Sequence, residues 1–344
     1  MNKTALSIVL FIASFSAFGQ PIAPTVIAFG SCDDEDEPQD MWKEIVLQKP
    51  QVWIWGGDNV YADTHDMALL KSKYDKQKSN PDYKTLLHTS IITGTWDDHD
   101  YGVNDGGKLY SKKDASKKQL LDFLGIAEPN QVWEHDGVYN SLTIGKNKQK
   151  IKIINLDTRS FRDTIYKVSY IDSLTQKKLT RYQVNPTGDV LGEAQWQWLT
   201  EELNDGEPKL FIINSSIQVL SEEHRFEKWG NLPTARKRLL DLLAAVNKKV
   251  IIISGDRHIG EFSKINLKGL SYPLYDFTSS GLTHTWSERW VEHNKYRVGE
   301  LVIEKTFGLI KVDWTLKEPK VVLQIRGLSK IPYAEQLIDF NKKN

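Results

Sequence analysis

Six short runs of apolar and β-branched residues dominate the pattern of this chain. They span residues 25–29, 51–55, 91–95, 151–156, 209–214 and 249–254. Each run is continuous rather than alternating, which is typical of strands that are covered on both faces. Amphipathic segments at 114–124, 193–204 and 233–246 separate some of these runs and are expected to be helices. This alternation predicts an α/β core.

The C-terminal part has a different pattern. Residues 301–303, 309–314 and 321–325 form short alternating or β-branched runs, separated by Gly308 and by the turn sequence at 317–319. These runs predict antiparallel strands at the edge of the same domain. Because the chain has 344 residues and 40% hydrophobic residues, and shows no low-complexity linker or repeat, we expect one domain over residues 20–344.

The first 19 residues predict an export signal. Lys3 supplies a positive charge, residues 5–18 are mostly apolar, and Ala17-Phe18-Gly19 is a small-residue cleavage signal. The apolar run is shorter than the roughly 18 uninterrupted residues that a membrane span needs. The sequence therefore predicts cleavage after residue 19, a periplasmic or secreted protein, and no membrane anchor.

Charge and cysteine content narrow the function classes. The 45 Lys and Arg residues balance 45 Asp and Glu residues, so the charge does not favour a nucleic-acid coat protein, and any recognition of phosphate must come from a local site. The single cysteine, Cys32, cannot form an internal disulfide. Its thiol is therefore inert, bonded to another molecule, or used in the chemistry of a site. The oligomeric state stays open.

Polar residues directly follow each of the six buried runs. In open α/β sheets such residues converge at the carboxyl ends of the strands, where ligands bind. Close carboxylates repel one another unless cations lie between them, so a metal site is the economical interpretation. A thiol and a phenol among oxygen donors favour iron in one position, and zinc or manganese stays possible. The segments are Gly30-Ser31-Cys32, Gly57-Asp58-Asn59-Val60-Tyr61, Asp97-Asp98-His99-Asp100, Asp157-Thr158-Arg159, Asn214-Ser215-Ser216 and Asp256-Arg257-His258.

These blocks, in this order, resemble the calcineurin-like metallophosphoesterases. The variant with Ser31-Cys32 first and Ser254-Gly255-Asp256-x-His258 last resembles the alkaline phosphatase D family, and the resemblance runs from about residue 29 to residue 284. Tyr61 is also similar to the tyrosine that binds ferric iron in purple acid phosphatases. The resemblance implies a sandwich of two β-sheets flanked by helices, with the antiparallel C-terminal strands, and a phosphatase or phosphodiesterase activity.

Carried over by position, the resemblance also implies roles for individual residues. Asp58 would bridge two metals, and His99 would contact the phosphoryl group and protonate the leaving alkoxide. The residues near the substrate or the second metal would be Arg159, either Asn214 or Gln218, and His284. The first metal would be bound by Cys32, Asp58, Tyr61 and His258, and the second by Asp58, Asp98 and Asp256.

The second metal position departs from the superfamily pattern. The histidine expected after the run at 209–214 has no evident counterpart in Asn214-Ser215-Ser216-Ile217-Gln218. An oxygen-rich second site, suited to Ca²⁺, fits this difference. We therefore expect two or more metal ions, Fe³⁺ with Ca²⁺ as the first choice and Zn²⁺ or Mn²⁺ as alternatives.

The expected reaction is metal-assisted hydrolysis of a phosphoester. Two cations about 3.5 to 4 Å apart lower the pKa of a shared water from 15.7 toward about 7, and the resulting hydroxide attacks phosphorus in line. The sequence leaves a phosphomonoester and a phosphodiester equally open. The alternative function is a secreted, noncatalytic metal- or glycan-binding protein on the same fold, although such a protein has no need of His99 as a proton donor. The acidic run 33–37 is expected to be a solvated loop, although its position directly after Cys32 leaves calcium binding open, and the same two interpretations apply to Asp63, His65 and Asp66.

Overall fold

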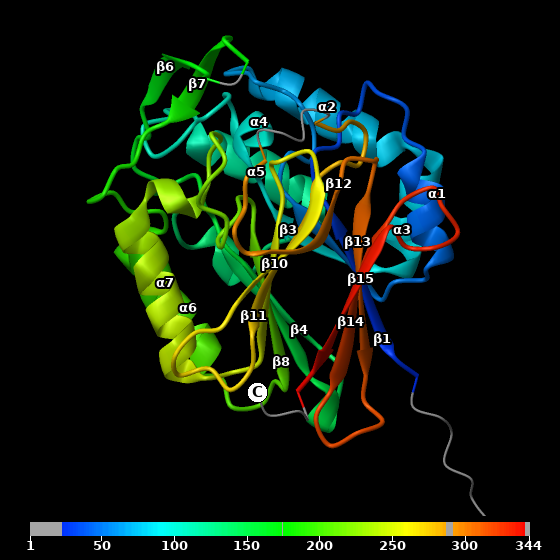
Figure 1. The fold of residues 1–344 in the computed structure, drawn as a ribbon. Coiled ribbons are helices and arrows are strands. Elements are labelled where there is room, and N and C mark those ends of the chain that lie inside the picture. Colours follow the sequence, from blue (N-terminus) through cyan, green and yellow to red (C-terminus); the bar gives the residue numbers. More distant parts are fainter. Residues whose placement is uncertain (1–22, 174, 287–291, 341–344) are drawn as a thin grey trace, which may run out of the picture.

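Two mixed β-sheets packed face to face form the centre of the molecule (Figure 1). The computed structural model describes residues 23–173, 175–286 and 292–340. The predicted signal peptide, residues 1–19, lies outside the described residues. None of the helices described is long and apolar enough to cross a membrane.

The first sheet has six strands. Strands β1, β2 and β3 are parallel neighbours, and β13, β14 and β15 extend the sheet with antiparallel pairing. In spatial order the strands are β15 (Ala334–Asp339), β14 (Lys320–Arg326), β13 (Phe307–Asp313), β1 (Thr25–Gly30), β2 (Val52–Gly56) and β3 (Ile91–Thr95). Two of the predicted C-terminal strands, the runs at 309–314 and 321–325, therefore belong to the same sheet as the first three buried runs.

The second sheet has seven strands. Its centre is parallel, with β5, β8, β9 and β11 side by side, and antiparallel strands lie at both edges. In spatial order the strands are β12 (Arg297–Val302), β10 (Gly260–Ile265), β11 (Leu274–Ser279), β9 (Val250–Ser254), β8 (Leu210–Ser215), β5 (Ile151–Asn155) and β4 (Asn140–Ile144). The run predicted at 301–303 is the end of β12, which pairs in this sheet and not with β13. A separate hairpin is formed by β6 (Lys167–Ile171) and β7 (Lys178–Tyr182).

Helices cover the outer faces of both sheets (Figure 1). The α7 helix begins with Pro233, whose fixed φ suits a first turn, and α5 is followed by Gly125 in the left-handed conformation. The helices are α1 (Met41–Leu47), α2 (Met67–Ser79), α3 (Pro81–Thr89), α4 (Asp98–Tyr101), α5 (Lys113–Leu124), α6 (Gly192–Asn204) and α7 (Pro233–Val246), with 3₁₀ turns at Gln131–Trp133, Asn147–Gln149 and Trp229–Asn231.

Three apolar clusters explain why the predicted elements form. Ile27, Ile54 and Ile212 belong to the cluster between the two sheets, and each is fully buried. Trp53 and Trp55 point to the other face of the first sheet, where they pack with Trp42 of α1. The strands are thus covered on both sides, which is why their sequences are continuously apolar. The predicted sandwich of two sheets flanked by helices is confirmed.

Candidate metal centre

Cys32 and Asp58 meet because the strands before them are parallel neighbours. Cys32 follows β1 and Asp58 follows β2, so both side chains leave the sheet at the same edge. The thiol donates to Oδ2 of Asp58 over 3.5 Å, and both residues are buried. The sequence-predicted pairing of the lone cysteine with this aspartate is therefore present in the structure.

The ends of both sheets contribute to one acidic cluster. Asp98 lies in the short α4 helix after β3 of the first sheet, and Asp256 follows β9 of the second. Carboxylate oxygens of Asp58, Asp97, Asp98 and Asp256 lie within 4.8 Å of one another. Residues nearly 200 positions apart in sequence thus share one crevice between the sheets.

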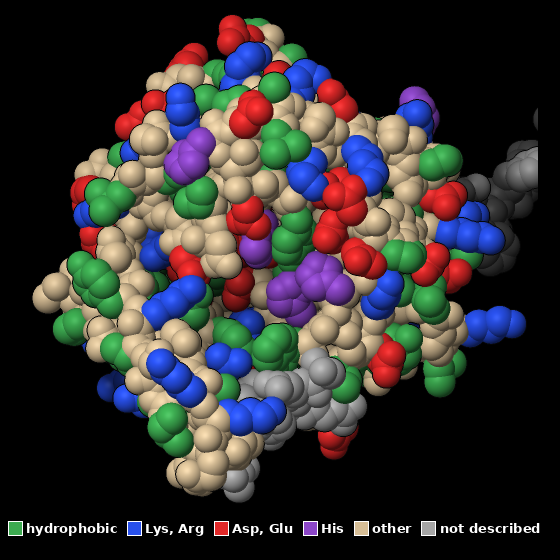
Figure 2. Space-filling model, turned by 90° about the horizontal axis from the view of Figure 1, so that it is seen from above, with side chains coloured by type: hydrophobic (Ala, Val, Ile, Leu, Met, Phe, Trp, Pro, Cys, Tyr) green, Lys and Arg blue, Asp and Glu red, His purple; other side chains and the backbone are tan. Residues whose placement is uncertain are grey.

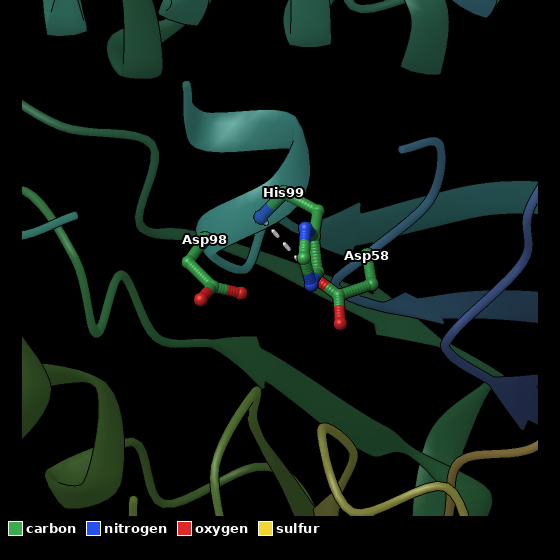
Figure 3. Close-up of side chains that lie close together, drawn as sticks. All are labelled: Asp58, Asp98 and His99. Atoms are coloured by element: carbon green, nitrogen blue, oxygen red, sulfur yellow. Dashed lines mark hydrogen bonds between the residues drawn. The ribbon is translucent and has the colours of Figure 1, made fainter. Parts of the chain in front are cut away.

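His99 adjoins the same carboxylates. A ring nitrogen of His99 and carboxylate oxygens of Asp58 and Asp98 form a second group within 4.8 Å, and Figure 3 shows the three side chains around a common space. The backbone N–H of His99 donates to Oδ1 of Asp58 over 3.3 Å. This contact fixes the start of α4 against the loop after β2.

Four of the expected ligands have a left-handed backbone. The φ angles are 58° at Cys32, 49° at Asp58, 64° at Asp256 and 54° at His258. Residues other than glycine rarely adopt this conformation, which costs about 1–2 kcal/mol each, and such strain is concentrated at functional sites. Here the strained backbone positions belong to residues whose side chains carry candidate metal-binding atoms.

Two glycines allow the loops of the site to approach closely. At Gly57, φ is +94° and a Cβ would lie 2.6 Å from the Cβ of Asp97. At Gly255, a Cβ would lie 2.4 Å from Oγ of Ser31. Any larger residue at either position would push the β2, β3 and β9 loops apart, so glycine is required for the acidic cluster to close.

Burial and mutual repulsion disfavour the charged forms of several site residues. Burial, followed by the negative charges of Asp58 and Asp256, raises the pKa of the Cys32 thiol well above its ordinary value. Burial likewise raises the pKa of Asp58, and it raises that of Asp256 to about 7 with a contribution from Asp98. A cation among these groups would reverse the effect and stabilise the thiolate and carboxylates.

Asp98 is the exception among the clustered acids. Burial acts to raise its pKa, but the positive charges of Arg159 and His99 and the backbone N–H of Asp105 outweigh it and hold the pKa at about 2. The Asp105 N–H donates to Oδ2 of Asp98 over 2.6 Å. Oδ1 of Asp98 is buried and has no hydrogen-bond partner among the described residues. One oxygen is thus held by the protein, and the other is left for a ligand.

Other unpartnered buried atoms surround the same crevice and fit a metal ion. Within the described part of the chain, the Tyr61 hydroxyl and Nδ1 of His258 also lack a hydrogen-bond partner. Buried polar atoms are rarely left unpaired in proteins. A thiol, a phenol, an imidazole and several carboxylates are donors that transition metals and Ca²⁺ accept. The donor set therefore fits bound metal ions.

Four rings, one phenol and three imidazoles, lie next to one another at the site. The Tyr61 ring centroid lies 4.3 Å from that of His99 and 5.1 Å from that of His284. The rings of His258 and His284 are 4.5 Å apart. The structure therefore places Tyr61, His258 and His284 together at the site, with histidine side chains gathered beside a hollow in the surface (Figure 2).

A contact of His99 was not predicted from the sequence. Nδ1 of His99 lies 2.7 Å from Oδ2 of Asp63. Burial by itself lowers the pKa of His99, but the charge of Asp58 and the hydrogen bond to Asp63 raise it to about 11. Asp63 is partly exposed, so the surface prediction overlooked its contact. The backbone N–H groups of Ala62 and Asp63 both donate to the carbonyl oxygen of His99, which fixes the loop in place.

Arg159 and Asn214 are held by protein groups and are fully buried. The Arg159 guanidinium binds Asp97 and donates to Glu227 over 2.8 Å. The Asn214 amide donates to the carbonyl oxygen of Trp55 over 2.9 Å and so joins β8 to β2 of the opposite sheet.

The acidic run at 33–37 differs from its prediction. Asp33 and Glu35 are buried, so the expectation of a solvated loop is wrong for these two residues. Glu35 and Asp36 pair with Lys73, and Asp36 also pairs with Lys76 of α2. The lysines come from an element whose contact with this loop cannot be deduced from local sequence, so the charge compensation was missed.

Comparisons with known proteins agree with this geometry. The chain is similar to a structure of PhoD, with a TM-score of 0.68 and 16% identity over 93% of this chain and 69% of that chain. It is also similar to a dimetal phosphatase from Danio rerio, with a TM-score of 0.53 and 12% identity over 92% of this chain and 99% of that chain. Curated proteins give no significant match.

These likenesses show the calcineurin-like fold, and the family follows from the sequence itself. The family model of the PhoD-like phosphatases matches residues 27–286, a range that contains all of the predicted metal ligands. The chain, a hydrolase with clustered acidic residues suited to several metal ions, therefore belongs to the PhoD-like phosphatase family.

Proposed function

We propose that this chain is an exported hydrolase that cleaves small phosphomonoesters or phosphodiesters, with His99 as the acid that protonates the leaving group. The single observation that carries the proposal is the convergence of Asp58, Asp98 and His99 within 4.8 Å at the meeting point of the two sheets. Family membership supports the phosphatase chemistry.

The metals would be held in two adjoining positions. The first metal would be bound by Cys32, Tyr61 and His258. The second would be bound by Asp98 and Asp256, and Asp58 would contact both metals. The thiol and phenol favour Fe³⁺ in the first position, and the carboxylates favour Ca²⁺ in the second, with Zn²⁺ or Mn²⁺ as alternatives. When bound, the metals supply the Lewis acidity that makes water a nucleophile at ordinary pH and offsets charge on the phosphoryl oxygens.

His99 would perform the proton transfer. The contact with Asp63 holds Nδ1 of His99, so that Nε2 is the nitrogen that donates the proton. Arg159 is assigned a positioning role in place of substrate contact, because it neutralises Asp97 beside the cluster. Asn214 is assigned to the junction between the sheets, and His284 remains the candidate for contact with substrate.

The test compares metal-dependent turnover of p-nitrophenyl phosphate and of bis(p-nitrophenyl) phosphate before and after chelation. Turnover should vanish on chelation and return with added metal. The His99→Ala variant should retain its metals and lose turnover by about 10²- to 10⁴-fold. The loss should be larger for an alkyl leaving group than for p-nitrophenolate, which needs little protonation. Loss of metal from this variant would show that His99 is a ligand.

The competing function is a noncatalytic metal- or glycan-binding protein. It predicts bound metal but no metal-dependent turnover of either ester. Export is tested separately by expressing the full chain with its first 19 residues and determining the N-terminus of the mature protein by mass spectrometry. A protein that starts at Gln20 supports export, and an intact N-terminus in the cytoplasm contradicts it.

A further inference from the structure

A cavity of about 640 Å³ lies between the β6–β7 hairpin and the segment at 222–231. Its lining includes three basic residues, Arg181, Arg225 and Lys228, together with Tyr170 and Tyr182. We call it the arginine pocket. No ligand of the metal centre is part of its lining.

Two walls of the arginine pocket contact groups that hold Asp98. The Tyr182 hydroxyl donates to Asp105, and the backbone N–H of Asp105 donates to Oδ2 of Asp98 over 2.6 Å. On the other wall, Lys228 directly follows Glu227, which accepts a hydrogen bond from Arg159 over 2.8 Å. Two consecutive hydrogen bonds therefore connect the Tyr182 wall of the pocket to Asp98 of the metal centre.

The two arginines of the pocket have no carboxylate partner among the described residues. The Arg225 guanidinium lies 4.2 Å from the ring centroid of Phe226, and Nη1 donates to the carbonyl oxygen of Thr180 over 3.0 Å. Nε of Arg225 is buried and unpartnered in the described part of the chain. Arg181 lies 5.3 Å from the ring centroid of Tyr170. Stacking on a ring orients a guanidinium and leaves its N–H edge available.

The acidic residues of the pocket are already engaged. Glu222 pairs with Arg236 and Lys295, at 2.5 Å in each case. Glu223 accepts the backbone N–H of Lys295 over 2.6 Å. These carboxylates are tied to groups on the side of α7 and β12, so they do not neutralise Arg181 and Arg225. The pocket keeps an excess of positive charge.

We propose that the arginine pocket binds a second phosphate group of the substrate while the first is hydrolysed at the metal centre. This inference rests on the proposed function and specifies its substrate class as molecules with two or more phosphates.

A phosphate fits this pocket better than an aromatic group. The planar fork of an arginine matches two phosphate oxygens, and its hydrogen bonds to an anion are about twice as strong as neutral ones. The tyrosine rings of the lining are not free platforms for a base, because Arg181 lies 5.3 Å from the centroid of Tyr170 and Lys167 lies 4.8 Å from that of Tyr182. The available groups are therefore N–H donors and not ring faces.

The test measures binding of nonhydrolysable phosphonates to the metal-loaded protein by isothermal titration calorimetry. Alkane-α,ω-bisphosphonates of two to eight carbons are compared with alkyl phosphonates of matching length. At the best chain length, the second phosphonate should lower Kd at least about tenfold, a change of roughly 1.4 kcal/mol. In Arg225→Gln, the decrease in Kd that the second phosphonate brings should be less than about threefold. Arg181→Gln provides a second variant if the first does not fold.

Lys177→Gln is the matched control, because it removes one positive charge from the same hairpin outside the pocket lining. It should keep the full gain. An equal gain in all variants, or no gain in the unaltered protein, would overturn the proposal. Equal weakening of mono- and bisphosphonates in Arg225→Gln would also overturn it, because Arg225 would then bind the shared phosphonate. Binding is measured without turnover, so an inactive protein that shows the gain contradicts only the proposed function.

Discussion

Oδ2 of Asp63 lies 2.7 Å from Nδ1 of His99, in a loop whose backbone N–H groups also bind the carbonyl oxygen of His99. The carboxylate thus orients the imidazole, and it stabilises the protonated form through a charge-assisted hydrogen bond. In the proposed reaction this arrangement supplies the proton for the leaving group.

The first prediction is that Asp63→Asn lowers kcat by about tenfold or more, because the orienting charge is lost, with the metal content unchanged. Turnover of an alkyl phosphodiester and metal content by mass spectrometry provide the measurement. Asp66→Asn is the control, since Asp66 lies in the same loop and caps α2 through the N–H of Ala68. Equal losses in the two variants would mean that loop structure, and not the contact with His99, matters.

The second prediction concerns the identity of the first metal. If Cys32 and Tyr61 bind Fe³⁺, the purified protein should absorb visible light by charge transfer from the thiolate and phenolate. Tyr61→Phe should shift or remove part of the band, and Cys32→Ser should change the remainder. Absorption spectra with element analysis provide the check. A colourless, iron-free and fully active protein would exclude the iron assignment.

The third prediction concerns acid stability. His224 is fully buried beside Gln218, and burial, followed by the positive charges of Arg257 and Lys228, lowers its pKa well below 6.5. Below about pH 6.5 the unfolded chain binds a proton at this position that the folded protein does not bind. The free energy of unfolding should therefore fall as pH falls, by up to about 1.4 kcal/mol per pH unit.

Urea unfolding at pH 7.5 and 5.5 measures this effect. His224→Gln should lose less stability on acidification than the unaltered protein, because it has no imidazole to protonate at this site. His88→Gln, at an exposed position on α3, should retain the full pH dependence. Identical pH dependence in His224→Gln and the unaltered protein would exclude His224 as the cause.

The fourth prediction concerns the buried charge network behind the site. Arg159 binds Asp97 and Glu227, and all three side chains are buried. Arg159→Met would leave the buried Asp97 without a cation, while Glu227 keeps its pair with Arg162 at 2.9 Å, and should lower the free energy of unfolding by about 3–5 kcal/mol. Arg238→Met breaks an exposed pair with Glu193 and should cost less than about 1 kcal/mol. Chemical denaturation of both variants gives the comparison, and similar small effects would contradict the assigned role.

Much of the strand pattern could be predicted because burial on both faces leaves a local signature. The runs at 25–29, 51–55 and 91–95 predict strands for this reason, and the structure confirms them within one residue at each end. The β6–β7 hairpin and α1 were missed, since the hairpin is largely exposed and α1 has only seven residues. Their positions depend on contacts with distant parts of the chain.

The sequence by itself determined which donor atoms follow each strand: the thiol of Cys32, the carboxylates of Asp58 and Asp256, and the imidazole of His99. Strand ends and residue types are local properties, so one linear pattern is enough to predict them. Only the tertiary structure decided that Asp63 contacts His99, that Arg159 is buried among carboxylates, and that Arg225 faces an open pocket. These relationships depend on how two sheets and a hairpin pack, and such packing reflects contacts between residues far apart in sequence.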